Sequence, residues 1–246
     1  MTDLLAVDHV SRRFGGLSAV RDVSFGIPRG QLVGLVGPNG AGKTTLFNVL
    51  VGLYAPSAGV VRLEGRTVSR LPPHRVCALG LTKTFQNVAL FFDMTVRDNV
   101  LVGGLMRHSL RDARDLASHT LERVGLASVA DKLAADLTFP ERARVELARA
   151  LCTEPKVLLL DEVMAALTHV EMDEILALIR QLREDGLTVL VVEHHMRAIM
   201  SLCERILVLN FGELIADGTP SEIVHDERVI TAYLGRGHGS ASARHA

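Results

Sequence analysis

A largely apolar run that ends in a glycine-rich turn constrains this chain more than any other feature. Residues Gln31–Val36 are expected to form a buried strand, and Gly37–Thr44 then follow the pattern G-x-x-x-x-G-K-[ST]. Residues Thr44–Leu50 are expected to form a helix. Glycines let successive backbone N–H groups point at a phosphate, and the helix N-terminus adds the positive end of its dipole. The sequence therefore predicts a phosphate-binding loop.

The loop predicts the contacts to a nucleoside triphosphate and its metal. Lys43 is expected to reach the β- and γ-phosphates, and the hydroxyl of Thr44 to ligate Mg²⁺. The residues expected to hold ATP in this loop are Gly37, Pro38, Asn39, Gly40, Ala41, Gly42, Lys43, Thr44 and Thr45.

A second motif places two acids at the end of another buried strand. Residues Val157–Leu160 are wholly apolar and are followed by Asp161 and Glu162. Open α/β sheets bind ligands at the carboxyl ends of their strands. We therefore expect Asp161 to hold Mg²⁺, mostly through water, and Glu162 to polarise an attacking water. Alone, the motif could be a strand that ends in two solvated acids. Beside a phosphate loop it favours a nucleotide site.

Hydrophobic periodicity predicts an α/β fold with an antiparallel β portion near the N-terminus and a helical insert at about residues 88–153. Further strands are expected at Leu4–Val10, Val23–Ile27, Val60–Leu63, Leu81–Phe85, Thr188–Val192 and Arg205–Leu209. Further helices are expected at Thr95–Gly103, Ser109–Val124, Phe139–Cys152 and Val170–Leu182. Residues 1–235 are interpreted as a single domain. Residues 236–246 lack periodicity and are interpreted as a disordered tail.

Composition excludes several classes of function. The chain of 246 residues carries 27 Lys and Arg against 28 Asp and Glu, and this net charge of −1 argues against a nucleic-acid partner. Its three cysteines are widely separated, which fits no zinc motif and favours a reducing compartment. No signal peptide is recognisable, and no apolar run approaches the roughly 18 residues of a membrane span.

The motifs together resemble the ATP-binding subunits of ABC transporters, and within them those of the branched-chain amino-acid importers. The resemblance covers about residues 4–235. The segments that carry it, besides the phosphate loop, are Arg13–Leu17, Thr84–Asn87, Leu160–Met164, Glu193–His194 and Gly212–Pro220. It implies a P-loop NTPase core of the ABC type.

The resemblance also assigns roles to single residues. Phe14 would stack on adenine, with Val20 beside it. Gln86 would contact Mg²⁺ or the attacking water and report on the membrane partner. His194 would bridge the γ-phosphate and Glu162. By resemblance, ATP would be bound between two head-to-tail subunits, either identical or different. The partners would be transmembrane permease subunits. The chain would be a peripheral protein at the cytoplasmic face of the inner (plasma) membrane. The transported solute would be a branched-chain amino acid or a similar small polar molecule.

Two segments depart from the family pattern, and both belong to elements that act across the dimer. Residues Leu137–Glu141 read Leu-Thr-Phe-Pro-Glu where the family has Leu-Ser-Gly-Gly-Gln, a motif that caps the γ-phosphate of the opposite subunit. Thr138 keeps the hydroxyl, but Pro140 lacks an N–H and Glu141 adds negative charge. Thr138 and Glu141 also have the spacing of a capping box. Residues Ala165–Thr168 replace the frequent Ser-Ala-Leu-Asp.

An apolar run beside Gln86 is either core or a docking groove for the membrane partner. Its residues are Val88, Leu90, Phe91 and Phe92. Two other functions stay open at this point. A soluble ABC-type ATPase outside transport usually carries two nucleotide domains or long coiled-coil insertions, and this chain shows neither. A weakly hydrolysing regulatory nucleotide-binding module would fit the altered segment Leu137–Glu141.

Overall fold

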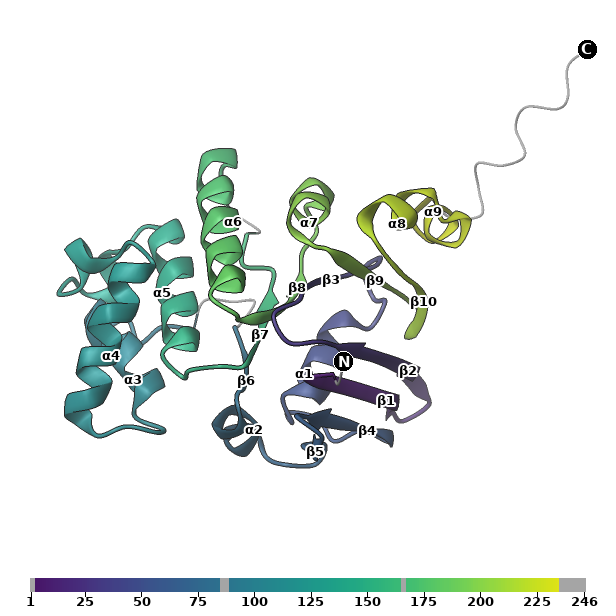
Figure 1. Cartoon of the computed structure of the whole chain (residues 1–246), viewed down its shortest axis with the longest axis horizontal. Coiled ribbons are helices and arrows are strands. Elements are labelled where there is room, and N and C mark those ends of the chain that lie inside the picture. Colours follow the sequence, from purple (N-terminus) through teal and green to yellow (C-terminus); the bar gives the residue numbers. More distant parts are fainter. Residues whose placement is uncertain (1–2, 85–88, 165–166, 235–246) are drawn as a thin grey trace, which may run out of the picture.

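The computed structural model describes residues 3–84, 89–164 and 167–234. Two sheets and a lobe of helices organise this part of the chain (Figure 1). The strands are β1 (Leu5–Phe14), β2 (Leu17–Ile27), β3 (Leu32–Val36), β4 (Ala58–Leu63), β5 (Arg66–Thr67), β6 (Leu81–Lys83), β7 (Val157–Asp161), β8 (Thr188–Val192), β9 (Arg205–Asn210) and β10 (Glu213–Gly218). The α-helices are α1 (Lys43–Leu50), α2 (Pro73–Leu79), α3 (Val96–Gly104), α4 (Leu110–Arg123), α5 (Phe139–Leu151), α6 (His169–Glu184), α7 (Met196–Leu202), α8 (Pro220–His225) and α9 (Glu227–Leu234).

The larger sheet has the strand order β10-β9-β3-β8-β7-β6, and only β10 runs antiparallel to its neighbour. Strands β3, β7 and β8 are buried along their whole length, as continuous apolar strands inside a parallel sheet should be. In the register of β7 against β8, Asp161 lies opposite Val192. The ends of these two strands therefore meet at one edge, where the motifs predict the site.

Alternate residues of the large sheet feed two separate cores. Val33, Leu35 and Leu159 face a core that includes α1 and the small antiparallel sheet β2-β1-β4-β5. Leu158, Leu160 and their neighbours face the core beneath α5, α6 and α7. Figure 1 shows α6 and α7 on one side of the sheet, and α1 with the small sheet on the other. The predicted α/β class with an antiparallel portion near the N-terminus is confirmed.

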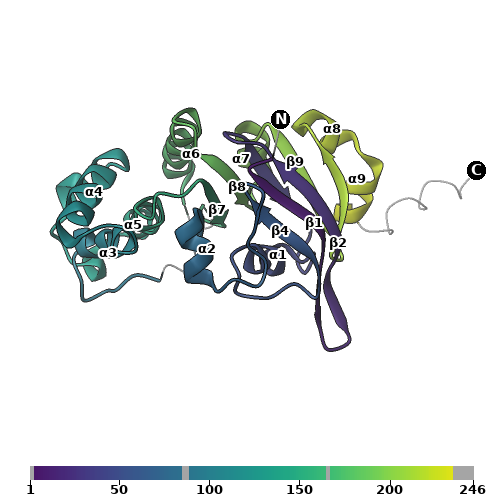
Figure 2. The same ribbon diagram turned by 60° about the horizontal axis from the view of Figure 1, so that its bottom comes forward.

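Helices α3, α4 and α5 form the helical lobe, which lies at one end of the molecule (Figures 1 and 2). Glycines allow its helices to approach closely. A Cβ at Gly103 would lie 2.3 Å from the carbonyl oxygen of Arg149, and one at Gly104 would lie 3.1 Å from the Cβ of Ala113. On α4, Ala113, Ala117 and Leu121 are buried, whereas Leu110, the first residue of the helix, is exposed.

Several elements differ from the sequence-based expectation. Strand β1 continues to Phe14 through register shifts, and β2 begins already at Leu17. Strand β6 ends at Lys83, and the expected extension to Phe85 lies outside the described residues. Helices α2, α7, α8 and α9 were not predicted, because each is only six to eight residues long and spans about two turns of periodicity.

Three helices begin with the same device, a Thr-x-x-Glu capping box at α5, α6 and α8. In α5 the Glu141 carboxylate accepts hydrogen bonds from the backbone N–H of Thr138 at 2.8 Å and from its hydroxyl at 2.9 Å. The backbone bond is the main cause that lowers the pKa of Glu141. The predicted capping box is therefore present, and it uses the hydroxyl that the resemblance assigned to a phosphate.

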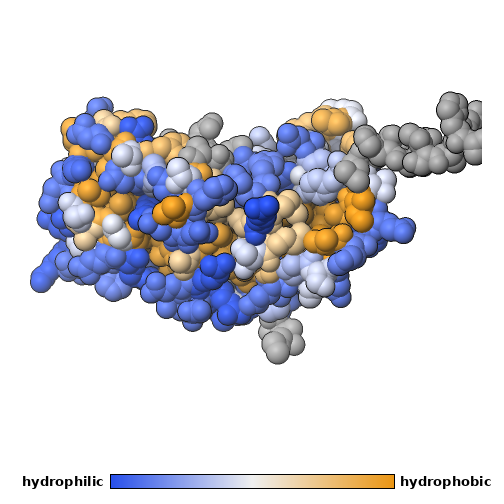
Figure 3. Space-filling view, turned by 90° about the horizontal axis from the view of Figure 1, so that it is seen from above, coloured by the Kyte–Doolittle hydropathy of each residue, from blue (hydrophilic) through white to orange (hydrophobic). Residues whose placement is uncertain are grey.

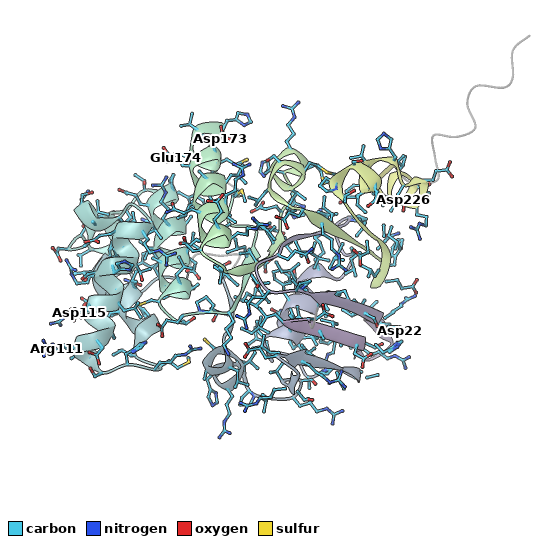
Figure 4. All side chains as sticks on the ribbon, viewed as in Figure 1. Asp22, Arg111, Asp115, Asp173, Glu174 and Asp226 are labelled. Carbon is cyan, nitrogen blue, oxygen red and sulfur yellow. The ribbon has the colours of Figure 1, made fainter. Side chains whose placement is uncertain are left out.

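The surface is mostly polar, with apolar patches toward the helical lobe and toward α8 and α9 (Figure 3). Labelled charged side chains such as Arg111 and Asp115 on α4 project outward (Figure 4). Glu174 on α6 forms an ion pair with Arg144 on α5, which ties the helical lobe to the sheet core. Among the described residues, no helix is both long enough and apolar enough to cross a membrane.

Candidate functional site

The phosphate loop connects β3 to α1 and owes its shape to glycines with positive φ. Gly37 has a φ of 151° and Gly42 a φ of 104°. A Cβ at Gly37 would lie 2.0 Å from the carbonyl oxygen of Leu209, and one at Gly42 would lie 2.3 Å from that of Ala19. Any other residue at these two positions would therefore collide with backbone. The fold needs glycine here for packing as well as for phosphate binding.

Lys43 folds back over the loop. Its Nζ donates hydrogen bonds to the carbonyl oxygens of Gly37 at 2.7 Å and Pro38 at 3.2 Å. The side chain is buried, and this burial lowers the pKa of Lys43, while the carboxylates of Glu162 and Asp161 oppose the shift. The ammonium is thus already held above the loop, where a β- or γ-phosphate oxygen would replace the carbonyl acceptors.

Asp161 ends β7 and is fully buried. Its backbone N–H donates to the hydroxyl of Thr84 at 3.1 Å, and the Nζ of Lys83 lies 2.8 Å from its Oδ2. Lys83 is the last residue of β6, the strand that pairs with β7, and Thr84 follows it directly. Lys83 is a residue that the sequence reasoning missed. Its only signal is its place directly before the motif Thr84–Asn87.

Glu162 and His194 meet across the ends of β7 and β8. Glu162 has a φ of 53°, and its backbone N–H donates to the carbonyl oxygen of Val192 at 2.9 Å. The Nε2 of His194 lies 2.7 Å from Oε1 of Glu162. The resemblance implied that His194 reaches Glu162, and in the structure the two side chains are in direct contact.

Glu193 lies directly before His194, just after the end of β8. The family resemblance rests partly on Glu193 but gave it no role. It is buried, and its Oε1 accepts a hydrogen bond from the backbone N–H of Met164 at 2.8 Å. Burial raises the pKa of Glu193 to about 7, and the charges of Glu162 and Asp161 add to the rise. Glu193 anchors the loop after β7 to the end of β8.

A cavity of about 590 Å³ opens above the phosphate loop. It brings together the loop, the Glu162–His194 pair, the start of β2 and the turn between β9 and β10. Its lining residues are Leu17, Ser18, Ala19, Arg21, Asn39, Gly40, Ala41, Gly42, Lys43, Thr44, Thr45, Glu162, His194 and Phe211. Most of the predicted nucleotide contacts within the subunit thus share one cavity.

Three other predicted site residues do not line the cavity. Phe14 is 38% exposed, but it does not line the cavity, and its ring packs edge-on against Tyr54 at 5.2 Å. Val20 is fully buried in the core and does not line the cavity either. Thr138 lies at the start of α5 and does not line the cavity either. Gln86 lies outside the described residues.

The apolar side chains that border the cavity are Leu17 and Phe211, both well exposed. Sequence reasoning gave them no role, because Leu17 starts β2 and Phe211 stands in the β9–β10 turn, and only the fold brings these two segments together. They offer an apolar surface to a nucleobase in the part of the cavity that is bordered by β2 and the β9–β10 turn.

The donor set fits magnesium. Mg²⁺ prefers oxygen ligands and keeps several waters when it binds with nucleotide phosphates. The Thr44 hydroxyl and the Asp161 carboxylate would supply the protein oxygens. Within residues 3–84, 89–164 and 167–234, no group of three His, Cys, Asp or Glu side chains could hold a metal by itself. A metal here would therefore depend on the nucleotide.

A second hollow of about 270 Å³ lies between the sheet core and the helical lobe. It is lined by Val51, Leu53, Pro73, His74, Cys77, Leu81, Thr82, Lys83, Glu146, Arg149, Ala150 and Thr153. The predicted docking groove used other residues. Of those, Leu90 is buried in the core, Phe91 and Phe92 are exposed but do not line the hollow, and Val88 lies outside the described residues.

Sequence comparison places these features among known proteins. The chain matches the ABC transporter family over residues 20–165 and the branched-chain amino acid ATP-binding cassette transporter family over residues 213–239. It is 43% identical to the high-affinity branched-chain amino acid transport ATP-binding protein BraF of Pseudomonas aeruginosa. It is 40% identical to the protein LivG of Escherichia coli, which has the same description. Each alignment covers 94% of this chain and 98% of the relative.

Solved structures agree. A nucleotide-free ATP-binding cassette from an ABC transporter matches with a TM-score of 0.88 at 26% identity, covering 95% of this chain and 100% of that one. A dimeric, post-hydrolysis cassette bound to ADP and Pi matches with a TM-score of 0.79 at 26% identity, covering 88% of this chain and 98% of that one.

Proposed function

This chain belongs to the ABC transporter ATP-binding family and hydrolyses ATP, and on that premise we propose that it drives an importer for branched-chain amino acids or a similar small polar solute. The observation that carries the proposal is the contact between Glu162 and His194 at the rim of the phosphate-loop cavity. The names of the relatives BraF and LivG support the class of solute.

The reaction is phosphoryl transfer to water, which needs positioning and charge stabilisation more than covalent chemistry. Lys43 and the loop N–H groups hold the phosphates. Glu162 orients and polarises the attacking water, and His194 holds that carboxylate in place from the neighbouring strand end. Mg²⁺, held by Thr44 and Asp161, would neutralise charge between the β- and γ-phosphates. These residues come from four elements, so the reaction needs the intact sheet edge.

We place the second half of the site on another ATPase subunit. Thr138 does not line the phosphate-loop cavity of its own subunit, so a γ-phosphate cover made from the segment around Thr138 would come from a second subunit. A head-to-tail partner would supply that cover from its segment at Leu137–Glu141. The dimeric structural relative supports such a pairing.

The hollow between the sheet core and the helical lobe is the site we assign to a permease subunit. It is mainly apolar, with Glu146 and Arg149 among its polar residues, and it contains Lys83, which reaches Asp161. A membrane partner seated there would touch both lobes. With a permease subunit bound there, the chain would be a peripheral subunit at the cytoplasmic face of the plasma membrane.

Reconstitution with the permease subunits from the same operon tests the function. ATP-dependent uptake of radiolabelled leucine into proteoliposomes is expected with the wild-type chain and is expected to stop with Glu162→Gln. Uptake that is unaffected by Glu162→Gln would contradict the assigned chemistry. Robust ATP hydrolysis without uptake of any branched-chain amino acid would contradict the assigned solute.

A further inference from the structure

Lys83 is an internal cation that lines the hollow between the sheet core and the helical lobe. Its side chain is only 9% exposed, and its Nζ lies 2.8 Å from Oδ2 of the fully buried Asp161. The same Nζ donates a hydrogen bond to Oδ1 of Asn48 at 3.1 Å and lies 5.9 Å from the centroid of the Phe47 ring. Lys83 thus connects β6 to the end of β7 and to α1.

The Lys83–Asp161 ion pair contains one of the two expected magnesium ligands, Thr44 and Asp161. Asn48 is one helical turn beyond Thr44 on α1, and Asp161 is the second expected metal ligand. The residue after Lys83, Thr84, accepts the backbone N–H of Asp161 at 3.1 Å. Two successive residues of the chain therefore hold Asp161, one through its backbone and one through its carboxylate.

A buried carboxylate needs a counter-charge, because an uncompensated charge in the protein interior is strongly unfavourable. Without a bound nucleotide there are no phosphates to help hold magnesium at Asp161. In that state the Lys83 ammonium supplies the positive charge at hydrogen-bonding distance. When the metal binds, two cations face one carboxylate and repel each other. Lys83 and Mg²⁺ then oppose one another at Asp161.

We propose that Lys83 is a positioning residue that substitutes for magnesium in the empty site: it holds Asp161 in place and sets the magnesium affinity of the nucleotide complex lower than Asp161 alone would give. This inference rests on the proposed ATP site. It predicts two effects of removing the lysine charge in the same variant. The stability of the nucleotide-free protein falls, and the magnesium affinity of the nucleotide complex rises.

The test compares Lys83→Met, Lys83→Gln and Lys83→Arg with wild type. Mg²⁺ is titrated into the protein with a fluorescent, non-hydrolysable ATP analogue, and thermal unfolding is followed without metal and nucleotide. Lys83→Met and Lys83→Gln are expected to bind Mg²⁺ about tenfold more tightly. They should also unfold several degrees lower when empty, and Mg²⁺ with the analogue should recover that loss. Lys83→Arg keeps the charge and should match wild type.

Lys156→Met is the matched control, because it removes a lysine that pairs with Glu64 on the surface. It should leave the Mg²⁺ titration unchanged. Lower stability of Lys83→Met and Lys83→Gln with an unchanged Mg²⁺ titration would overturn the proposal, since it would show a merely structural ion pair. If wild type itself binds the analogue without any dependence on Mg²⁺, the proposed ATP site fails instead. Should Lys83→Met not fold, Lys83→Gln decides, because it retains a donor for Asp161.

Discussion

The Nε2 of His194 lies 2.7 Å from Oε1 of Glu162 although the two residues are 32 positions apart. They meet because β7 and β8 are parallel neighbours that end at the same sheet edge. This contact orients the Glu162 side chain in the protein without a nucleotide.

Glu162→Gln should reduce ATP turnover at least about 100-fold and keep nucleotide binding, because the amide preserves shape but is no longer a base. His194→Ala should also reduce turnover, because the carboxylate loses the group that orients it. Phosphate release and equilibrium binding of a fluorescent ATP analogue measure the two effects. His195→Ala is the control, since its ring faces Glu193 at 3.9 Å and not Glu162. Wild-type turnover in Glu162→Gln would remove Glu162 from the mechanism.

Lys43→Ala should weaken ATP binding about 10- to 100-fold, as expected for the loss of charge-assisted hydrogen bonds worth about 1.5–3 kcal/mol. The folded state should tolerate the change, because the variant removes a buried cation whose pKa burial already lowers. Binding titrations and thermal unfolding check both parts. An unchanged dissociation constant would mean that Lys43 keeps its carbonyl partners when ATP is bound.

Glu193 should make stability depend on pH. Its pKa of about 7 in the folded protein lies above its ordinary value of 4.5 because the side chain is buried. The folded state therefore binds more protons than the unfolded state in that window, so the free energy of unfolding falls as pH rises from about 4.5 to 7. The change in the free energy of unfolding caused by Glu193→Gln should be about 2–3 kcal/mol more favourable to the folded state at pH 8 than at pH 5. Denaturant unfolding at both pH values measures this, and an equal effect at both would refute it.

Replacement of Phe139, Pro140 and Glu141 by Gly-Gly-Gln should raise the turnover of the isolated chain and its ATP-driven dimerisation. In the wild type the Thr138 hydroxyl donates to Glu141 within its own helix start, and Pro140 offers no N–H to a phosphate. Loss of the cap should lower stability by about 1 kcal/mol.

Glu222→Gln is the control for this change, because it alters the same capping box at α8. It should cost similar stability without raising turnover. Fast, cooperative hydrolysis by the unmodified chain, not improved by the replacement, would show that the variant segment is already a working phosphate clamp.

Leu53→Glu should uncouple ATP hydrolysis from transport while the chain stays folded. Leu53 is exposed and lines the hollow assigned to the permease, so a charge there would oppose an apolar partner. Leu110→Glu, also exposed but on α4 away from that hollow, should leave transport intact. Equal transport by both variants would place the permease elsewhere.

The sequence alone determined the elements whose cause is local. Glycine spacing predicts the phosphate loop, apolar runs predict the strands β3, β7 and β8, and Thr138 with Glu141 predicts a capped helix. These features depend on φ angles, periodicity and hydrogen bonds within a few residues. The role of Glu162 was predicted from its place after an apolar strand and that of His194 from family resemblance, and their contact followed once β7 and β8 paired.

Only the tertiary structure decided which distant side chains share a space. Strand order puts β6 beside β7, so Lys83 meets Asp161, and β2 with the β9–β10 turn brings Leu17 near Phe211 at one cavity. The same packing buries Val20 and Leu90, which the sequence left as candidate contacts. Apolar character alone cannot distinguish a core residue from a docking residue, because both avoid water. The distinction arises only in the folded protein, where packing of the sheets and helices buries the core residue and leaves the docking residue exposed to solvent.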